Sequence, residues 1–245
     1  MSETKEFKRP GGELSNRPLH FIWVVDCSGS MHGEKIGKVN HAIQSTIPEM
    51  ADAARNNPYA ELLIRTLKFS SGAQWVTPEP VNVDNFCWSD LEAGGVTDMG
   101  NAFDLISSQL TIPPMSDRAL PPVLVLISDG QPTDDYKTAL DKLLALPWGK
   151  KSVRIAISIG QDADVSILNE FTGNRDLVLQ ANNSADLVKM IKWASTAAAV
   201  VSAPATPDST TVAGGAGGSN SSPIIFDINN IPVPEESDPD DINVW

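Results

Sequence analysis

The residues best suited to chemistry lie in a short loop near the start of the chain. Asp26, Ser28 and Ser30 alternate in the segment Asp-Cys-Ser-Gly-Ser, directly after an apolar run. Alternation within a tight loop aims these three side chains at one spot, where they supply one carboxylate and two hydroxyls. Such hard oxygen ligands suit Mg²⁺, and also Mn²⁺ or Ca²⁺, better than zinc. The low charge of the set would leave a bound metal electrophilic.

Two later loops offer further oxygen donors. Thr97 follows a glycine-rich turn in the segment GGVTDMG, and Asp98 is adjacent to it. Asp129 comes after the apolar run PPVLVLIS and before Gly130, which would allow a sharp turn. Each of these residues alone is commonly a turn or helix-cap residue. Their ordered occurrence favours a metal site instead, with the ligand set Asp26, Ser28, Ser30, Thr97 and Asp129.

The segments around these loops alternate between strand and helix patterns. We predict strands over 20–26, 60–70, 74–78, 121–130, 152–160 and 176–180. We predict helices over 36–50, 99–109, 133–146, 164–171 and 184–200, with Pro48 kinking or ending the first. The third strand should form a hairpin with the second. The pattern predicts a doubly wound, mostly parallel, six-stranded α/β sheet with helices on both faces. Ligands of such sheets bind at the carboxyl ends of strands, where the strand order reverses.

The composition divides the chain into four parts. Residues 1–17 form a polar N-terminal lead, and residues 18–201 form the domain. Residues 202–223 are rich in Ala, Gly, Ser, Thr and Pro, which is typical of a flexible linker. Residues 224–245 combine apolar side chains with acids. We interpret this last segment as an interaction tail and a second docking element.

The charge and cysteine content exclude several classes of function. The net charge is −13, and the chain after residue 201 contains seven acids and no Lys or Arg. No basic cluster suited to nucleic acid is present, and the acidic balance disfavours anionic membranes. Two cysteines without a C-x-x-C spacing, three scattered histidines and a polar N-terminus indicate a cytoplasmic protein with reduced thiols and no zinc site.

The joint pattern resembles a known family. D-x-S-x-S, a Thr in a glycine loop and an Asp after an apolar strand match the metal-ion-dependent adhesion site (MIDAS) of von Willebrand factor A domains. All five positions match, and the resemblance covers residues 18–200. Within this family, the segments DCSGSMHGEKI, NNPYAEL, GGVTDMGNAF and SDGQPTDDY resemble the TerY-like proteins of bacterial tellurium-resistance and stress operons.

The resemblance implies a Rossmann-like fold and a protein-binding function rather than an enzyme. It implies that Mg²⁺ keeps one open coordination position, which takes an acidic side chain from a partner protein. It further implies an adaptor of a bacterial stress-response, tellurium-resistance or defence operon, acting with a Ser/Thr protein kinase or a PP2C-type phosphatase. We expect Asp26→Ala to abolish metal binding and spare the fold, because Asp26 should lie in a surface loop.

Two alternatives remain open from the sequence. Phosphoryl transfer of the haloacid-dehalogenase type uses D-x-D-x-T, but here Ser28 stands at the second acidic position and cannot act as acid or base near neutral pH. A serine-hydrolase elbow and a P-loop are both missing from the sequence. The second alternative is a metal-independent scaffold that acts through residues 224–245. Acids of that segment could also reach the metal of their own domain.

Overall fold

The computed structural model describes residues 16–57, 60–129, 131–160, 163–181 and 185–192. The expected linker 202–223, the tail 224–245, Gly130 and nearly all of the N-terminal lead lie outside the described residues. No helix within the described residues combines the length and apolarity needed to cross a membrane.

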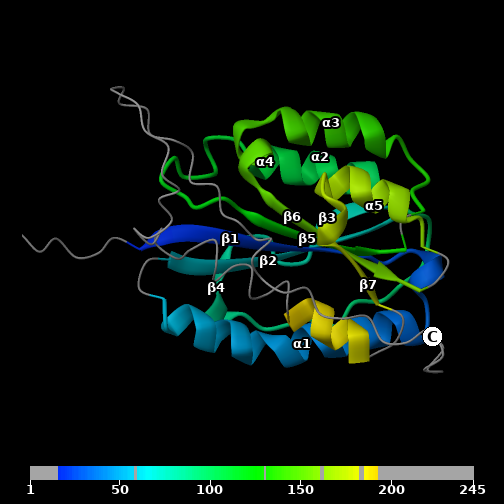
Figure 1. The fold of residues 1–245 in the computed structure, drawn as a ribbon, viewed down its shortest axis with the longest axis horizontal. Coiled ribbons are helices and arrows are strands. Elements are labelled where there is room, and N and C mark those ends of the chain that lie inside the picture. The colour runs from blue at the N-terminus through cyan, green and yellow to red at the C-terminus, as the bar shows by residue number, and fades with distance from the viewer. Residues whose placement is uncertain (1–15, 58–59, 130, 161–162, 182–184, 193–245) are drawn as a thin grey trace, which may run out of the picture.

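A seven-stranded mixed sheet forms the centre of the described structure, in the order β3-β2-β1-β5-β6-β7, with β4 also paired to β2 (Figure 1). The pairings among β1, β2, β5, β6 and β7 are parallel, whereas β3 and β4 run antiparallel to β2. The strands are β1 (Arg17–Asp26), β2 (Ala60–Ser70), β3 (Gly72–Trp75), β4 (Val81–Asn82), β5 (Val123–Ser128), β6 (Val153–Ile159) and β7 (Val178–Ala181).

The central strand β1 is buried on both faces because its apolar residues alternate between two cores. Phe21, Trp23 and Val25 pack into one core. Ile22 and Val24 pack into the other. A continuous apolar run is what a parallel strand covered on both sides requires. The expected doubly wound α/β fold is therefore confirmed.

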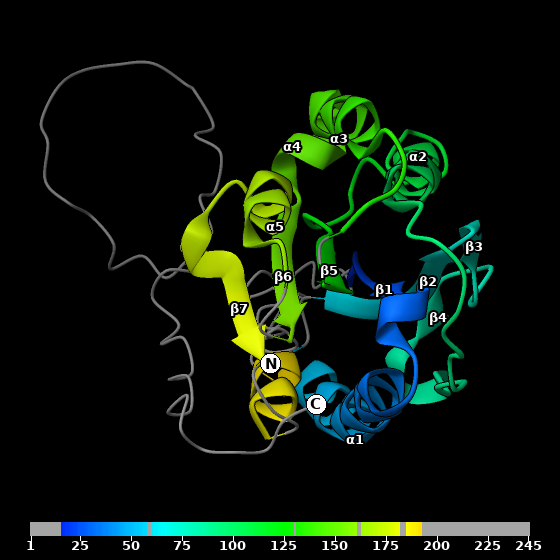
Figure 2. The same ribbon diagram turned by 90° about the vertical axis from the view of Figure 1, so that its right-hand side faces the viewer.

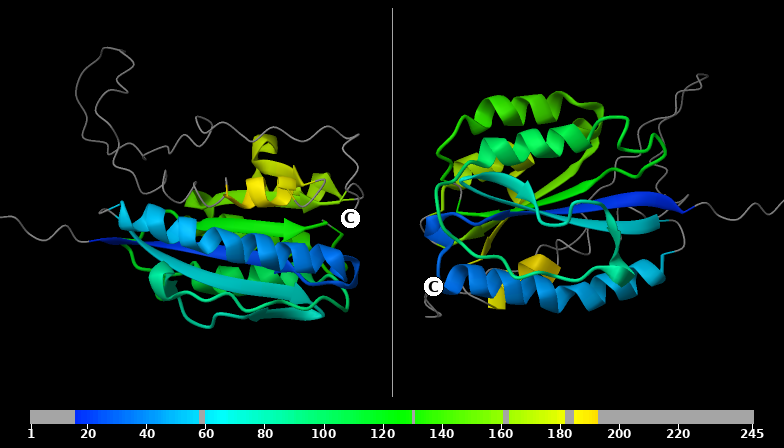
Figure 3. Two further views of the ribbon diagram at one scale, coloured as in Figure 1. Left: turned by 90° about the horizontal axis from the view of Figure 1, so that it is seen from below. Right: turned by 180° about the vertical axis from the view of Figure 1, so that it is seen from behind.

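Helices cover the two faces unequally (Figure 2). One face carries α1, which runs along the length of the sheet (Figure 3), together with the helical residues 185–192. The other face carries α2, α3, α4 and α5. The helices are α1 (Glu34–Arg55), α2 (Met99–Gln109), α3 (Tyr136–Ala145), α4 (Pro147–Lys151) and α5 (Val165–Thr172). Short 3-10 turns lie at Gly29–Met31, Val83–Asn85 and Arg175–Leu177.

Several boundaries differ from the sequence expectation. The sheet has seven strands rather than six, because the two-residue strand β4 is too short to show any alternation. Helix α1 continues through Pro48 to Arg55, since residues on both sides of the exposed proline, such as Ile43 and Met50, are buried in one core. Helix α3 begins at Tyr136, later than expected, with Asp135 accepting a hydrogen bond from the Thr138 amide at 3.2 Å.

Candidate functional site

The site lies where β1 and β5 end side by side. These parallel strands are paired with Val25 beside Ile127, so Asp26, the last residue of β1, lies close to the residues that close β5. The chain reaches β2 on one side of β1 and β5 on the other, which makes this edge the point where strand order reverses. Such a position is where doubly wound sheets bind ligands.

Asp26 is completely buried at this edge. Its Oδ1 accepts a hydrogen bond from the Ser28 amide at 2.8 Å, and its Oδ2 accepts one from the Ser128 hydroxyl at 2.6 Å. Burial raises the pKa of the Asp26 carboxyl; the hydrogen bonds from Ser128 and Ser28 oppose this, and the charge of Asp129 adds to it. The expectation that Asp26 occupies a surface loop is therefore wrong. An alanine there would leave a gap and remove the acceptor of two hydrogen bonds.

The two serines of the first loop lie together, as their alternation predicts. The Oγ atoms of Ser28 and Ser30 are 3.0 Å apart. Ser28 is buried and Ser30 is exposed, with the 3-10 turn Gly29–Met31 following Ser28. Two hydroxyls thus extend from the buried Asp26 carboxylate toward the surface.

The glycine loop that precedes Thr97 is joined to the first loop by backbone hydrogen bonds. The Gly29 amide donates to the Gly95 carbonyl at 3.0 Å, and the Gly94 amide donates to the Cys27 carbonyl at 2.7 Å. Gly95 has a φ of 89°, and a Cβ there would lie 2.5 Å from the Ser71 Oγ. A side chain at this position would therefore be both strained and obstructed. The glycine loop holds Thr97, which is 6% exposed, against the loop that carries the serines.

Asp129 is the second buried carboxylate of the site. It is 4% exposed, and its Oδ1 is buried without a hydrogen-bond partner. Its backbone carbonyl accepts from the Asp164 amide at 2.8 Å, which fixes the chain at the end of β5. A buried carboxylate oxygen without a partner is costly unless a cation or water satisfies it. The donor set of two carboxylates and several hydroxyls therefore fits a hard divalent cation.

Neighbouring residues take other roles. Cys27 points into the core, and burial, together with the charge of Asp26, raises the pKa of its thiol to about 12. His32 is exposed. Asp98 accepts a hydrogen bond from the Gly72 amide at 2.7 Å and so acts as a turn residue. Among the described residues, no cluster of three or more His, Cys, Asp or Glu could hold a metal, so the hydroxyls are essential to this candidate site.

Sequence reasoning missed Ser128. Its hydroxyl is fully buried and holds the Asp26 carboxylate in place. The available signal was a hydroxyl residue at the end of an apolar strand, immediately before the acid Asp129. Because β1 and β5 are neighbours, that hydroxyl is directed at the end of β1.

Comparisons with known proteins support a von Willebrand factor A domain. No family model matches the chain. A von Willebrand factor A domain-containing protein of Dictyostelium discoideum is 25% identical over 129 residues, which is 52% of this chain and 15% of that protein. A von Willebrand factor type A structure from Catenulispora acidiphila superimposes with a TM-score of 0.55 at 16% identity, covering 75% of this chain and 43% of the other.

A third similar protein is proximal thread matrix protein 1 from the mussel byssus, in a structure with a zinc-occupied MIDAS motif. Its TM-score is 0.55 at 16% identity, and the match covers 73% of this chain and 47% of that one. The chain therefore spans less than half the length of each of these three proteins. At these identities, the solved structures establish the fold alone.

Proposed function

We propose that this chain is a metal-dependent protein-binding module rather than an enzyme. Asp26, Ser28, Ser30, Thr97 and Asp129 hold a divalent cation, with Mg²⁺ preferred over Mn²⁺ or Ca²⁺. When bound, the cation acts as a Lewis acid that accepts an oxygen ligand from outside the chain. A carboxylate of the partner protein supplies that ligand.

One observation carries this proposal. Asp26 and Asp129 are both buried at one sheet edge, and an oxygen of Asp129 has no hydrogen-bond partner. The charge of Asp129 adds to the rise in the pKa of the Asp26 carboxyl. Among the described residues, neither carboxylate takes part in an ion pair. Two buried like charges without a counterion are costly to maintain. A bound divalent cation would remove that cost.

The surface beside the site suits a partner protein. Val96 is 48% exposed, and it immediately precedes Thr97. An apolar side chain next to a metal-bound carboxylate would add a contact that excludes water from the bridge. We propose that Val96 contributes this contact. The TerY-like motifs support, by resemblance, a Ser/Thr protein kinase or PP2C-type phosphatase as partner and a bacterial stress, tellurium-resistance or defence operon as the cytoplasmic setting.

Direct metal binding is the first test. Isothermal titration calorimetry on the full chain, with Mg²⁺, Mn²⁺, Ca²⁺ and Zn²⁺ in turn, should show one site per chain. Asp26→Asn preserves the size of the side chain and should lose this site, whereas Arg55→Ala at the far end of α1 should retain it. If the wild type binds none of these ions, or if Asp26→Asn binds them equally well, the five residues are not a metal site.

Partner binding is the second test. Wild type and Asp26→Asn are used as bait in host extract, each in Mg²⁺ and in EDTA, and candidate kinases and phosphatases are then retested as purified proteins. Retention only by wild type in Mg²⁺ is the expected result. Equal retention in all four conditions would instead favour a metal-independent scaffold, and deletion of residues 224–245 would then test whether the tail makes the contact.

A further inference from the structure

The segment that follows Asp129 returns to the loop that carries Thr97. The Thr97 amide donates a hydrogen bond to the Thr133 Oγ1 at 3.0 Å, and the Thr133 amide donates one to the Thr97 carbonyl at 2.8 Å. The Thr133 hydroxyl also donates to the Asp98 Oδ1 at 3.4 Å. These two reciprocal hydrogen bonds join the loop that carries Thr97 to the loop that follows Asp129. The two candidate ligands are therefore positioned together rather than independently.

Asp134 adds a second connection between the same two loops. Its Oδ1 accepts a hydrogen bond from the Gly100 amide at 2.9 Å, and its Oδ2 accepts one from the Asn101 amide at 3.1 Å. These amides belong to the first turn of α2, where donors have no partner within the helix. Asp98 precedes α2 but makes no capping bond. The cap of α2 therefore comes from the loop after β5, and its negative charge also suits a helix N-terminus.

Gly100 makes this close approach possible. A Cβ at Gly100 would lie 2.9 Å from the Asp134 Oδ2, 3.0 Å from the Asp135 carbonyl oxygen and 3.1 Å from the Tyr136 Cα. Glycine is disfavoured inside a helix relative to alanine, so its presence in the first turn of α2 needs a packing reason. The contact with residues 134–136 provides that reason.

We propose that Thr133 and Asp134 are positioning residues of the candidate metal site, fixing the Thr97 loop to the Asp129 loop so that both ligands are held ready for the cation. This inference rests on the proposed function. Neither residue is a ligand; each acts through the backbone next to Thr97. Outer residues that orient metal ligands commonly change metal affinity by about 10- to 100-fold when they are removed.

The test measures Mn²⁺ affinity of the full chain by calorimetry. Thr133→Val keeps the shape of the side chain but removes the acceptor of the Thr97 amide, and Asp134→Ala removes the cap of α2. Both should weaken Mn²⁺ binding by about tenfold. Thr133→Ser retains the hydroxyl and should restore affinity close to that of the wild type. Asp135→Ala is the matched control, because it removes a cap of α3 one residue away and should lower thermal stability without changing affinity.

Hydrogen exchange provides a readout that does not depend on metal. In metal-free protein, the Thr97 amide should exchange faster in Thr133→Val, and the Gly100 and Asn101 amides faster in Asp134→Ala. If the wild type and Asp26→Asn differ in Mn²⁺ binding but Thr133→Val binds as tightly as the wild type, the positioning role is wrong and the proposed function stands. If the wild type binds neither Mn²⁺ nor any of the other three cations, the proposed function fails and this inference fails with it.

Discussion

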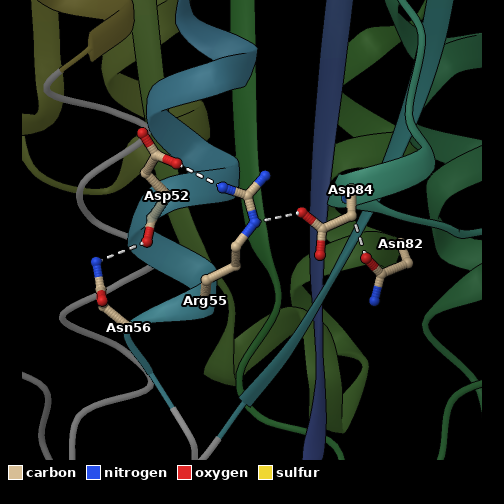
Figure 4. A network of polar contacts seen from close by, with 5 residues as sticks. All are labelled: Asp52, Arg55, Asn56, Asn82 and Asp84. Atoms are coloured by element: carbon tan, nitrogen blue, oxygen red, sulfur yellow. Dashed lines mark hydrogen bonds and ion pairs between the residues drawn. The ribbon is translucent and has the colours of Figure 1, made fainter.

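At the amino end of the sheet, Arg55 at the end of α1 pairs with Asp52 at 2.6 Å and with Asp84 at 2.9 Å (Figure 4). These side chains are between 47% and 71% exposed. At the carboxyl end, Asp26 and Asp129 are buried, and an oxygen of Asp129 has no hydrogen-bond partner. Helix α1 and the sheet thus extend from an amino end with exposed ion pairs to a carboxyl end with two buried carboxylates.

The difference shows where the molecule tolerates an energetic cost. Exposed ion pairs contribute little to stability because water already solvates and screens both partners. Buried carboxylates without a counterion lose solvation, and the hydrogen bonds to Asp26 offset that loss only in part. Two buried carboxylates close together at one edge of a sheet are typical of a binding site, where the ligand supplies the missing charge.

The largest expected effect is at Asp26. Asp26→Asn removes one of the two buried charges and should weaken metal binding by about a thousandfold, in line with the cost of breaking a buried charge pair. The same change should raise the free energy of unfolding of the metal-free protein by about 1 kcal/mol, because the repulsion from Asp129 disappears. Differential scanning calorimetry in Mg²⁺ and in EDTA measures both the stabilisation by bound metal and the free energy of unfolding of the metal-free protein. A metal-free variant that loses more than about 2 kcal/mol would show that Asp26 is stabilising by itself.

The reaction rates of the two cysteines show whether the carboxyl end of the sheet is closed to solvent. Cys27, next to Asp26, is 1% exposed, whereas Cys87, three residues after Asp84, is exposed. Cys87 should react at least about a hundredfold faster with Ellman's reagent, because Cys27 can react only after local opening of the structure. One fast thiol should be counted in native protein and two in denaturant. In Cys87→Ser, Cys27 is the remaining thiol. Rapid labelling of this native variant would mean that the loop following β1 opens readily.

A smaller effect is expected at Ser128. Ser128→Ala removes the hydrogen bond to the Asp26 Oδ2 and should lower metal affinity by about tenfold, since an unheld carboxylate must be oriented during binding. Ser158 is the matched control: it lies beside Ser128 in the sheet register, and its buried hydroxyl has no partner. Ser158→Ala should leave affinity unchanged in calorimetry. Equal losses in both variants would point to a general weakening of the sheet.

The sequence predicts the site better than its surroundings. Four of the candidate residues, Asp26, Ser28, Ser30 and Asp129, are short oxygen donors at or after the end of an apolar strand, and strand ends meet at one edge of a parallel sheet. Thr97 instead follows a glycine-rich loop shortly before α2. That local signal places Asp26, Ser28 and Ser30 together. Metal binding by the five residues stays a prediction, which the calorimetric titration tests.

What sequence reasoning missed depends on contacts between distant segments. The bond from Ser128 to Asp26 joins residues 102 positions apart, and Asp134 caps α2 from the loop that follows β5. A capping pattern is read along one helix, so a cap supplied by another loop leaves no local signal. Similarly, the helix passes Pro48 because tertiary packing on both sides outweighs the loss of one backbone hydrogen bond.

The smallest expected effect is at the amino end of the sheet. Arg55→Ala breaks both ion pairs, yet the freed Asp52 and Asp84 carboxylates remain in water, so the free energy of unfolding should fall by less than about 1 kcal/mol. Lys38→Ala is the matched control on the same helix, because it breaks an ion pair with Glu34. Urea unfolding should show small and similar losses for both variants, each reduced further in high salt. A loss of more than about 2 kcal/mol in Arg55→Ala alone would mean that these exposed ion pairs are important for stability. The contrast with the buried carboxylates would then no longer distinguish an edge that binds a ligand from an edge that stabilises the fold.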